Sequence, residues 1–401
     1  MAPSFGRCPP WGRGRPWGGP ATGRPLRSHT LPLVPITAAD ALVALDTFSA
    51  VIDARSECEY ALDRIPGAAN WPSLNDGERA QVGTEYKQAS PFSARKRGAA
   101  MVARNIAAHI ERELIEAPRE WSPLVYCWRG GQRSGALAAV LDQIGFRVHL
   151  LEGGYRAYRR AVVDALDALP RRFDLRVICG PTGSGKSRLL GALAVRGEQV
   201  LDLEALANHR GSVLGLVPGT TQPSQKQFDS RIWDTLRRLD PARPVFIESE
   251  SKKVGDLRVP ERLIERMRAA PCLWLELPLE ARVSLLIADY DHFVADPAAF
   301  CDRLDALRAQ RGHETVNGWQ AAVRAGHSAE VVHALLVDHY DPIYLQSMQR
   351  NFAGVAEPAL RLEWDGSDAS LARAAERAGA AGAADVARLQ TLVARQTSAL
   401  N

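Results

Sequence analysis

The chain has 401 residues, of which 46% are hydrophobic and 24% charged, as is ordinary for a globular protein of two or three domains. Five arginines precede the first acidic residue, Asp40, and subtracting them from 50 basic residues leaves 45 against 46 acidic ones. This balance excludes a nucleic-acid site spread over the whole surface and leaves only a local basic patch. No run approaches the roughly 18 apolar residues of a membrane helix, so we expect no membrane partner.

The segment 1–32 is rich in glycine, proline, arginine and tryptophan, and it lacks the apolar core of a secretory signal. We therefore predict a disordered extension, or a start assigned upstream of the true one. None of the six cysteines forms a Cys-x-x-Cys pair or a zinc-ligand spacing. Scattered thiols are typical of a reducing cytoplasm, so we expect a cytoplasmic protein without metal-ligand residues of its own.

From about residue 33, short apolar runs alternate with helical segments. We predict a first domain over 33–165, with a turn-rich stretch at 65–72. Its expected helices cover 37–45, with Thr37 as N-cap, 97–116 and 134–144, and its expected strands cover 50–53, 124–127 and 147–151. A helix over 156–169 ends before Pro170, and the boundary between domains is expected near 170–174.

A second alternation begins after this boundary and predicts a further domain over 170–364. Its expected strands cover 175–179, 200–203, 245–248 and 272–277, and a helix covers 186–196. The segment 365–401 is rich in alanine and arginine, and we interpret it as a peripheral C-terminal helix. The alternation in both domains indicates an α/β fold with parallel sheets covered on both sides.

The first candidate site is a strand, a glycine-rich turn and a helix around Cys127. Such a turn directs backbone N–H groups inward and forms an anion nest at a helix N-terminus. The helix dipole and the nearby Arg129 and Arg133 would favour the reactive thiolate. We predict Cys127 as the catalytic residue and substrate contacts from Arg129, Gly130, Gly131 and Arg133. A buried structural cysteine is the alternative, but the two glycines and two arginines favour a functional one.

The spacing from Cys127 to Arg133 is Cys-x5-Arg, with Ser134 following it. This spacing also belongs to cysteine phosphatases, whose loop encloses a tetrahedral oxyanion. A phosphatase is therefore an open alternative on this motif alone. It would require a general acid, and the sequence does not identify one.

The second candidate site is a complete Gly-x4-Gly-Lys-Ser phosphate-binding loop between an apolar strand and a helix. Its backbone N–H groups would face a phosphate, Lys186 would supply a positive charge, and Ser187 would ligate Mg²⁺. We expect a di- or triphosphate here, with Mg²⁺ accompanying it and no tightly bound cofactor. Candidates for holding Mg²⁺ through water are Asp202, Glu248 and Glu250. The predicted phosphate-binding residues are Gly180, Thr182, Gly183, Ser184, Gly185, Lys186 and Ser187.

The cysteine loop resembles the active loop of rhodanese domains, and residues 52–57, 65–70 and 151–155 resemble other signatures of that domain. In that family the loop cysteine carries a persulfide. Asp53 and Arg55 are interpreted as an internal ion pair. A rhodanese domain directly before a P-loop domain resembles the tRNA 2-selenouridine synthase family. Segments 76–88, 202–212, 222–228 and 248–255 add to this resemblance, which extends over about 33–360.

The resemblance implies a transferase that replaces sulfur by selenium in wobble 2-thiouridine of tRNA, with selenophosphate as donor. It also implies a geranylated 2-thiouridine intermediate made from geranyl diphosphate. Cys127 would then serve the selenium step, while the P-loop would hold the diphosphate. The alternative is a rhodanese-type sulfurtransferase or Cys-x5-Arg phosphatase coupled to a nucleotide-binding domain. The oligomeric state is not predicted.

Basic residues interleaved with tyrosines in the connector 153–176 suit a tRNA groove between the domains, or equally a solvated helix face. Arg159 and Arg160 are the groups on which that groove hypothesis depends. The stretch 95–97 forms a second basic cluster.

Overall fold

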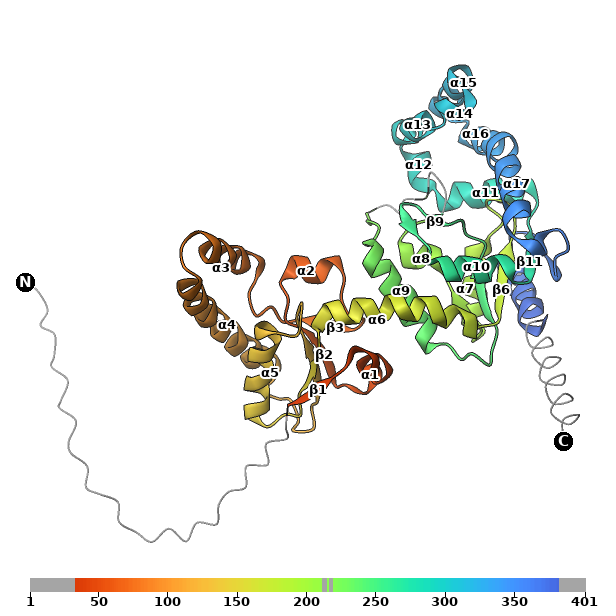
Figure 1. Ribbon diagram of the computed structural model, residues 1–401. Helices are drawn as coiled ribbons and strands as arrows, with labels where there is room; N and C mark the ends of the chain where they lie inside the picture. The colour runs from red at the N-terminus through yellow and green to blue at the C-terminus, as the bar shows by residue number, and fades with distance from the viewer. Residues whose placement is uncertain (1–32, 211–214, 216–218, 382–401) are drawn as a thin grey trace, which may run out of the picture.

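The computed structural model describes residues 33–210, 215 and 219–381 (Figure 1). The predicted N-terminal extension, 1–32, lies outside the described residues, as does the end of the predicted C-terminal helix. In the described part, two parallel sheets each carry helices, which confirms the predicted α/β class. No helix there is both long and apolar enough to cross a membrane.

The first sheet is five-stranded and parallel, in the order β1-β5-β4-β2-β3. Its strands, in that order, are Val34–Ile36, His149–Leu151, Pro123–Tyr126, Ala50–Asp53 and Ala68–Asn70. The helices of this domain are α1 (Ala38–Val43), α2 (Glu57–Leu62), α3 (Asp76–Gln88), α4 (Pro91–Glu113) and α5 (Gln132–Ile144). Thr37 caps α1 by accepting from the Asp40 N–H at 3.2 Å, as predicted.

The second sheet is also five-stranded and parallel, in the order β12-β11-β6-β8-β7. Its strands, in that order, are Leu360–Glu363, Cys272–Glu276, Leu175–Cys179, Val245–Glu248 and Gln199–Leu201. Packed with it are α7 (Lys186–Val195), α8 (Leu203–Ala207), α9 (Gln225–Arg238), α10 (Glu261–Ala269) and a helix over 368–381. A short hairpin joins β9 (Lys253–Val254) to β10 (Leu257–Arg258).

A helical lobe follows β11 and stands above the second sheet in Figure 1. It consists of α11 (Leu279–Asp289), α12 (Asp291–Ala295), α13 (Pro297–Asp305), α14 (Arg308–Arg311), α15 (His313–Arg324), α16 (Ser328–Ala334), the π-helical turn η3 (Leu335–Tyr340) and α17 (Asp341–Asn351). The lobe has its own core, in which Phe300, Leu304 and Val316 are buried.

Helix α6 (Gly154–Ala168) and the turn η2 (Leu169–Arg172) connect the two sheets. Tyr158, Val162 and Leu166 on α6 are buried in a core cluster that continues into the second domain. The Tyr158 hydroxyl donates to Ser230 Oγ on α9 at 2.8 Å. The two domains are therefore packed against each other through the connector.

Most predicted strands and helices are present within a residue or two, and 175–179 and 245–248 are strands with those bounds. The stretch 65–72, predicted to be turn-rich, contains a turn at 66–67 and also the strand β3, which was not predicted. This strand has three residues, too few to show an alternating pattern. β12 was not predicted, because it lies at a sheet edge and alternates apolar with charged residues.

Candidate active sites

Cys127 directly follows β4, and the turn after it leads into α5. Its side chain is buried, and Sγ accepts a hydrogen bond from Ser134 Oγ at 3.1 Å. Burial raises the pKa of the Cys127 thiol, but hydrogen bonds from the Ser134 hydroxyl and from the N–H groups of Ser134, Arg129 and Gly131 outweigh it and leave that pKa below its ordinary value. The loop thus stabilises a thiolate, as its anion-nest pattern indicates.

The predicted arginines occupy different positions around this loop. Arg133 donates to Glu59 Oε2 on α2 at 2.8 Å, so its guanidinium is held by a carboxylate. The Arg129 side chain is exposed to solvent. The Ser134 hydroxyl and backbone N–H groups, and not the two guanidinium groups, therefore make the direct contacts that lower the Cys127 pKa. The predicted anion nest contributes as expected, whereas the Ser134 hydroxyl was not predicted.

Two glycines allow the cysteine loop to lie against the start of α6. Gly154 has φ +58°, and a Cβ there would collide with the Cys127 carbonyl oxygen. Gly130 has φ +67°, and its Cβ would lie 2.7 Å from the Leu151 carbonyl oxygen. Because only glycine fits these positions, both are required for the loop's shape.

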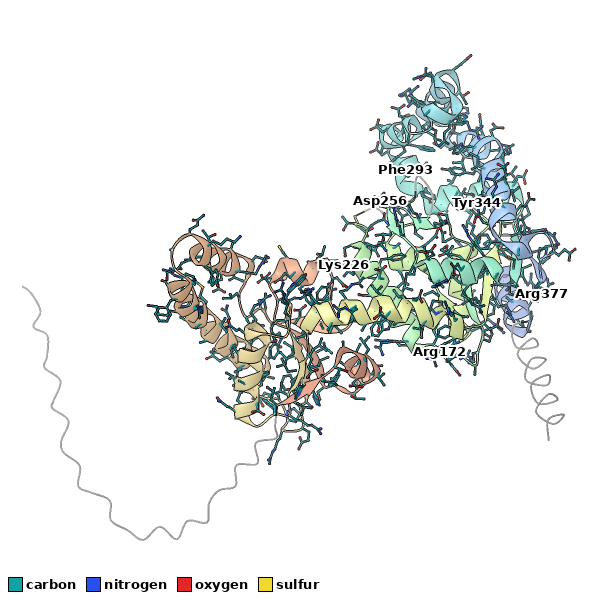
Figure 2. The ribbon with its side chains drawn as sticks, viewed as in Figure 1. Arg172, Lys226, Asp256, Phe293, Tyr344 and Arg377 are labelled. Carbon is teal, nitrogen blue, oxygen red and sulfur yellow. The ribbon has the colours of Figure 1, made fainter. Side chains whose placement is uncertain are left out.

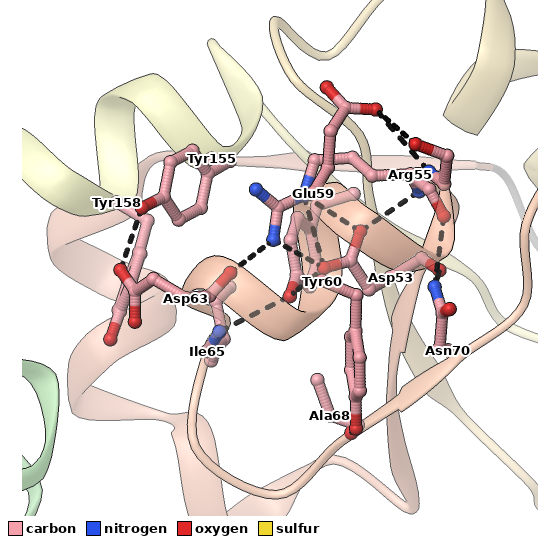
Figure 3. A network of polar contacts seen from close by, with 12 residues as sticks. Asp53, Arg55, Glu59, Tyr60, Asp63, Ile65, Ala68, Asn70, Tyr155 and Tyr158 are labelled. Atoms are coloured by element: carbon pink, nitrogen blue, oxygen red, sulfur yellow. Dashed lines mark hydrogen bonds and ion pairs between the residues drawn. The ribbon is translucent and has the colours of Figure 1, made fainter. Parts of the chain in front are cut away.

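A buried polar network lies beneath the loop (Figure 3). Arg55 and Asp53 form an ion pair at 2.6 Å with both side chains buried, which confirms the predicted internal pair. The Tyr126 hydroxyl donates to Asp53 at 2.7 Å, and the Tyr155 hydroxyl donates to the buried Asp63 at 2.7 Å. These bonds join β2, β4, α2 and α6, and they hold in place the carboxyl end of β4, which Cys127 follows.

The connector arginine Arg159 serves the domain interface. Its side chain is only 14% exposed and pairs with Asp229 of α9 at 2.9 Å, while its Nε lies 3.8 Å from Asp63 of the first domain. Arg159 therefore bridges the two domains, so its guanidinium is already engaged at the position where the groove hypothesis places an RNA contact. Arg160 is exposed.

The P-loop connects β6 to α7, as predicted. Lys186 Nζ donates to the carbonyls of Gly180 at 3.2 Å and Pro181 at 3.3 Å, so the side chain folds over the loop. It also lies 5.1 Å from the centre of the Tyr344 ring. Two carbonyl oxygens of the loop therefore hold the Lys186 ammonium against the P-loop backbone.

Two groups distant in sequence support the loop. The Trp364 indole donates to the Ser184 carbonyl at 2.8 Å, and a Cβ on Gly185 would collide with its ring. Arg282 donates to the Thr182 carbonyl at 2.9 and 2.6 Å and pairs with Asp341 at 2.6 Å. Sequence reasoning missed both, because each approaches the loop only through tertiary packing.

Three carboxylates form a glutamate cluster beside the P-loop: Glu204, Glu248 and Glu250 offer oxygens that all lie within 4.8 Å of one another. Ser187 Oγ donates to Glu204 at 2.9 Å and to Glu248 at 3.3 Å. Burial, followed by the Glu204 charge, raises the pKa of Glu250 to about 8 and that of Glu248 well above its usual range. Such oxygens beside a P-loop serine fit a hard divalent cation.

Glu248 and Glu250 were predicted near Mg²⁺, whereas Glu204 was missed as a candidate. Glu204 follows β7, and the Asp202 side chain caps the start of its helix. The available signal was the acidic pair Asp202 and Glu204 just after a strand, since loops at the carboxyl ends of parallel strands gather at one edge.

Burial lowers the Lys186 pKa, but the charges of Tyr344 and the glutamate cluster raise it more, so Lys186 stays cationic.

A cavity of about 960 Å³ opens from the P-loop toward the helical lobe. One end is polar and includes Lys186, Ser187, Glu204 and Glu250. The other end is apolar and includes Phe293, which Figure 2 labels. Tyr344, also labelled there, belongs to the polar end, 5.1 Å from Lys186 Nζ. The remaining apolar lining comes mainly from Leu286, Phe300, Leu335, Leu336 and Ile343. The cavity thus suits a ligand with a phosphate head and a hydrocarbon tail.

Comparison with known proteins assigns the chain to a family. Residues 37–161 match the rhodanese-like domain, and residues 173–321 match the tRNA 2-selenouridine synthase AAA domain. The tRNA 2-selenouridine synthase of Alcanivorax borkumensis is 31% identical over 345 residues, covering 78% of this chain and 93% of that protein. This chain belongs to the tRNA 2-selenouridine synthase family. The enzyme of that name from Bdellovibrio bacteriovorus is 32% identical, with 78% and 92% covered.

A third relative, the tRNA 2-selenouridine synthase of Nitrosomonas europaea, is 36% identical over 244 residues. That match covers 60% of this chain and 63% of the relative, which is less than two thirds of its length. In this member of the synthase family, both candidate loops lie within the matched domains. The apolar lining of the cavity forms a wall, part of which comes from Leu335, Leu336 and Ile343. These three residues follow residue 321 and so lie outside the matched AAA domain.

Proposed function

We propose that this chain is a tRNA 2-selenouridine synthase that acts on wobble 2-thiouridine in two steps. The first step attaches a geranyl group to the sulfur, and the second replaces the geranylated sulfur by selenium from selenophosphate. The observation that carries the proposal is the cavity that joins the P-loop to an apolar wall. The relatives' names support tRNA as the macromolecular substrate.

The cavity would hold geranyl diphosphate. Lys186 and the P-loop N–H groups would bind the diphosphate, while the wall around Phe293 and Leu336 would cover the hydrocarbon chain. Mg²⁺ would be held by Ser187 and the glutamate cluster, where it would screen the charge of the diphosphate. A nucleotide would fill this cavity poorly, because the end opposite the P-loop consists mainly of hydrocarbon side chains.

In the first step, the sulfur of 2-thiouridine forms a bond to C1 of the geranyl group. The C1–O bond breaks, diphosphate leaves with the electron pair, and the N3 proton of the base passes to solvent. Binding of the diphosphate at the P-loop stabilises the charge that develops on this leaving group. Alkylation also prepares the second step, because it turns a poor leaving group into a neutral thiol.

In the second step, selenium bonds to C2 of the base and the C2–S bond breaks. Geranyl thiol leaves with a proton from solvent, and water cleaves the P–Se bond to release phosphate. We assign the selenium donor to the Cys127 loop, with anion contacts from the N–H groups around Gly130 and Gly131 and from Arg129. Since the two loops lie in different domains, the base would be presented to each in turn.

The arrangement of Arg133 favours this proposal over a Cys-x5-Arg phosphatase. In such a phosphatase the arginine must bind the phosphate that the cysteine attacks. Here its guanidinium is bound to Glu59 at 2.8 Å. A phosphatase would lose that contact before it could bind its substrate.

Mass spectrometry of wobble nucleosides tests the proposal. Purified protein is incubated with 2-thiouridine tRNA and geranyl diphosphate, and selenophosphate is added in a second stage. We expect a mass gain of one geranyl group, followed by conversion to 2-selenouridine. If neither product forms, while phosphate is released from an aryl phosphate by Cys127, the phosphatase alternative replaces the proposal.

A further inference from the structure

Helices α3 and α4 form a hairpin that projects from the first domain, and we call residues 76–113 the arm (Figure 1). None of the thirteen residues of α3 is buried. A helix that buries no apolar side chain adds little hydrophobic stabilisation to its domain. Helix α3 therefore serves some purpose other than completing the core, whereas α4 contributes Ile106 to it.

The arm is nevertheless firmly built. Asn75 and Glu78 form a capping box at the start of α3, and Asn105 on α4 donates to Glu78 at 2.6 Å. Near the other end, Glu85 accepts from Ser93 Oγ at 2.7 Å and pairs with Arg97 at 2.7 Å. These bonds hold α3 on α4 at both ends, so the tip of the arm has a defined shape.

The tip presents aromatic and cationic side chains to solvent. Phe92 is 66% exposed and Tyr86 is 52% exposed, which is unusual for large aromatic groups. Lys96 Nζ lies 4.9 Å from the centre of the Phe92 ring, and Lys87 and Arg95 are exposed beside it.

The charge at the tip is largely uncompensated. Among the residues that the structure describes, Lys87, Arg95 and Lys96 have no carboxylate partner, because Glu85 is already paired with Arg97. The arm as a whole carries seven basic and five acidic residues, a net charge of +2, and the stretch 86–97 at its tip carries four basic residues and no acidic one. The tip thus concentrates positive charge locally.

The base of the arm is fastened to the helix that carries the cysteine loop. Ser73 Oγ donates to the Arg133 carbonyl on α5 at 3.0 Å, and Asn105 donates to the Ser73 carbonyl at 3.2 Å. A helix of the length of α3 spans about 20 Å at 1.5 Å per residue. The tip is therefore held at a fixed offset from the site assigned to the selenium step.

We propose that the tip of the arm docks tRNA at a part of the molecule away from the modified nucleotide. Lys87, Arg95 and Lys96 contact backbone phosphates, and Phe92 or Tyr86 stacks on an unpaired base. This inference rests on the proposed function for the identity of the RNA. The positive charge and exposed rings match RNA better than an apolar protein partner, which would offer nothing to balance the three cations.

A charge-reversal variant tests the arm. In K87E/R95E/K96E, we expect the Kd for a full-length 2-thiouridine tRNA to rise at least tenfold. The slope of log Kd against log salt should fall by about 2 to 3, because each phosphate contact contributes roughly 0.7 to 0.9. The matched control is R119E/R147E/R196E, which reverses three exposed arginines away from the arm and should change Kd less than a third as much. Circular dichroism confirms that both variants fold.

A second measurement separates docking from chemistry. Geranylation of a short anticodon-loop oligonucleotide should be unchanged in the arm variant, since the oligonucleotide does not reach the tip. F92A should raise the tRNA Kd roughly fivefold or more through lost stacking.

Unchanged tRNA affinity and salt slope in the arm variant would overturn the inference. An equal loss of geranylation on the oligonucleotide would overturn it too. So would a change in oligomeric state without loss of RNA binding. If wild type binds tRNA through the arm yet modifies nothing, the proposed function fails and the inference stands.

Discussion

The backbone N–H of Tyr155 donates a 2.8 Å hydrogen bond to the carbonyl of Cys127, so the first turn of α6 holds the loop that carries the reactive thiol. One turn further along α6, Tyr158 and Arg159 contact Ser230 and Asp229 of the second domain. A single helix therefore links the cysteine loop directly to the P-loop domain. Arg159 stabilises that link through its ion pair with Asp229.

The first prediction concerns the reactivity of Cys127. Its pKa is lowered, so the thiolate forms at a lower pH than in an ordinary cysteine, and alkylation by iodoacetamide should reach half its maximal rate at that lower pH. The exposed Cys58 is an internal reference, because its hydrogen bond to Asp76 and the Asp76 charge raise its pKa. Peptide mapping should therefore show a lower midpoint for Cys127 than for Cys58, despite the burial of Cys127.

Ser134 provides the matching variant. Ser134→Ala removes the hydroxyl that donates to Sγ, so the Cys127 midpoint should move to higher pH while that of Cys58 stays in place. Ser122→Ala, on the same domain but outside the loop, should move neither. An unchanged Cys127 midpoint in Ser134→Ala would show that this hydroxyl does not stabilise the thiolate.

The second prediction separates the two half-reactions. Lys186→Ala should lower geranylation at least a hundredfold, because it removes a charge that faces the diphosphate, yet it should still convert pre-geranylated tRNA to 2-selenouridine. Cys127→Ser should do the opposite. Each variant serves as the folding control for the other, and nucleoside mass spectrometry reads both steps. Loss of both steps in either variant would contradict separate sites.

The sequence was sufficient wherever a site is local. The P-loop and the cysteine turn each lie between a strand and a helix contiguous in sequence, so the local pattern predicted the structural setting of Cys127 and Lys186. Glu204 was missed because its approach to Ser187 depends on β7 lying beside β8, a pairing that no local pattern encodes. The partners of Arg159 were not predicted, because Asp63 and Asp229 are far away in the chain.

The third prediction concerns stability. Arg55→Met removes one member of the buried pair and leaves the Asp53 charge without a partner, which should lower the free energy of unfolding by about 3 to 5 kcal/mol. Adding Asp53→Asn should recover part of this loss, because the uncompensated charge is then absent. Chemical denaturation measures both variants. A double variant no more stable than Arg55→Met would indicate that the lost contacts to Asp63 and Tyr155 dominate.

The fourth prediction concerns the length of the hydrocarbon chain. Phe293 and Phe300 stack with ring centres 5.8 Å apart in the lobe, at the apolar end of the cavity. Phe300→Ala should open space there, so kcat/KM for farnesyl relative to geranyl diphosphate should rise about tenfold, at a stability cost of about 3 kcal/mol. Phe352→Ala, a buried residue outside the cavity lining, should cost similar stability without changing that ratio. Equal ratios in the two variants would mean that the cavity does not select the chain, and that the apolar wall has another ligand.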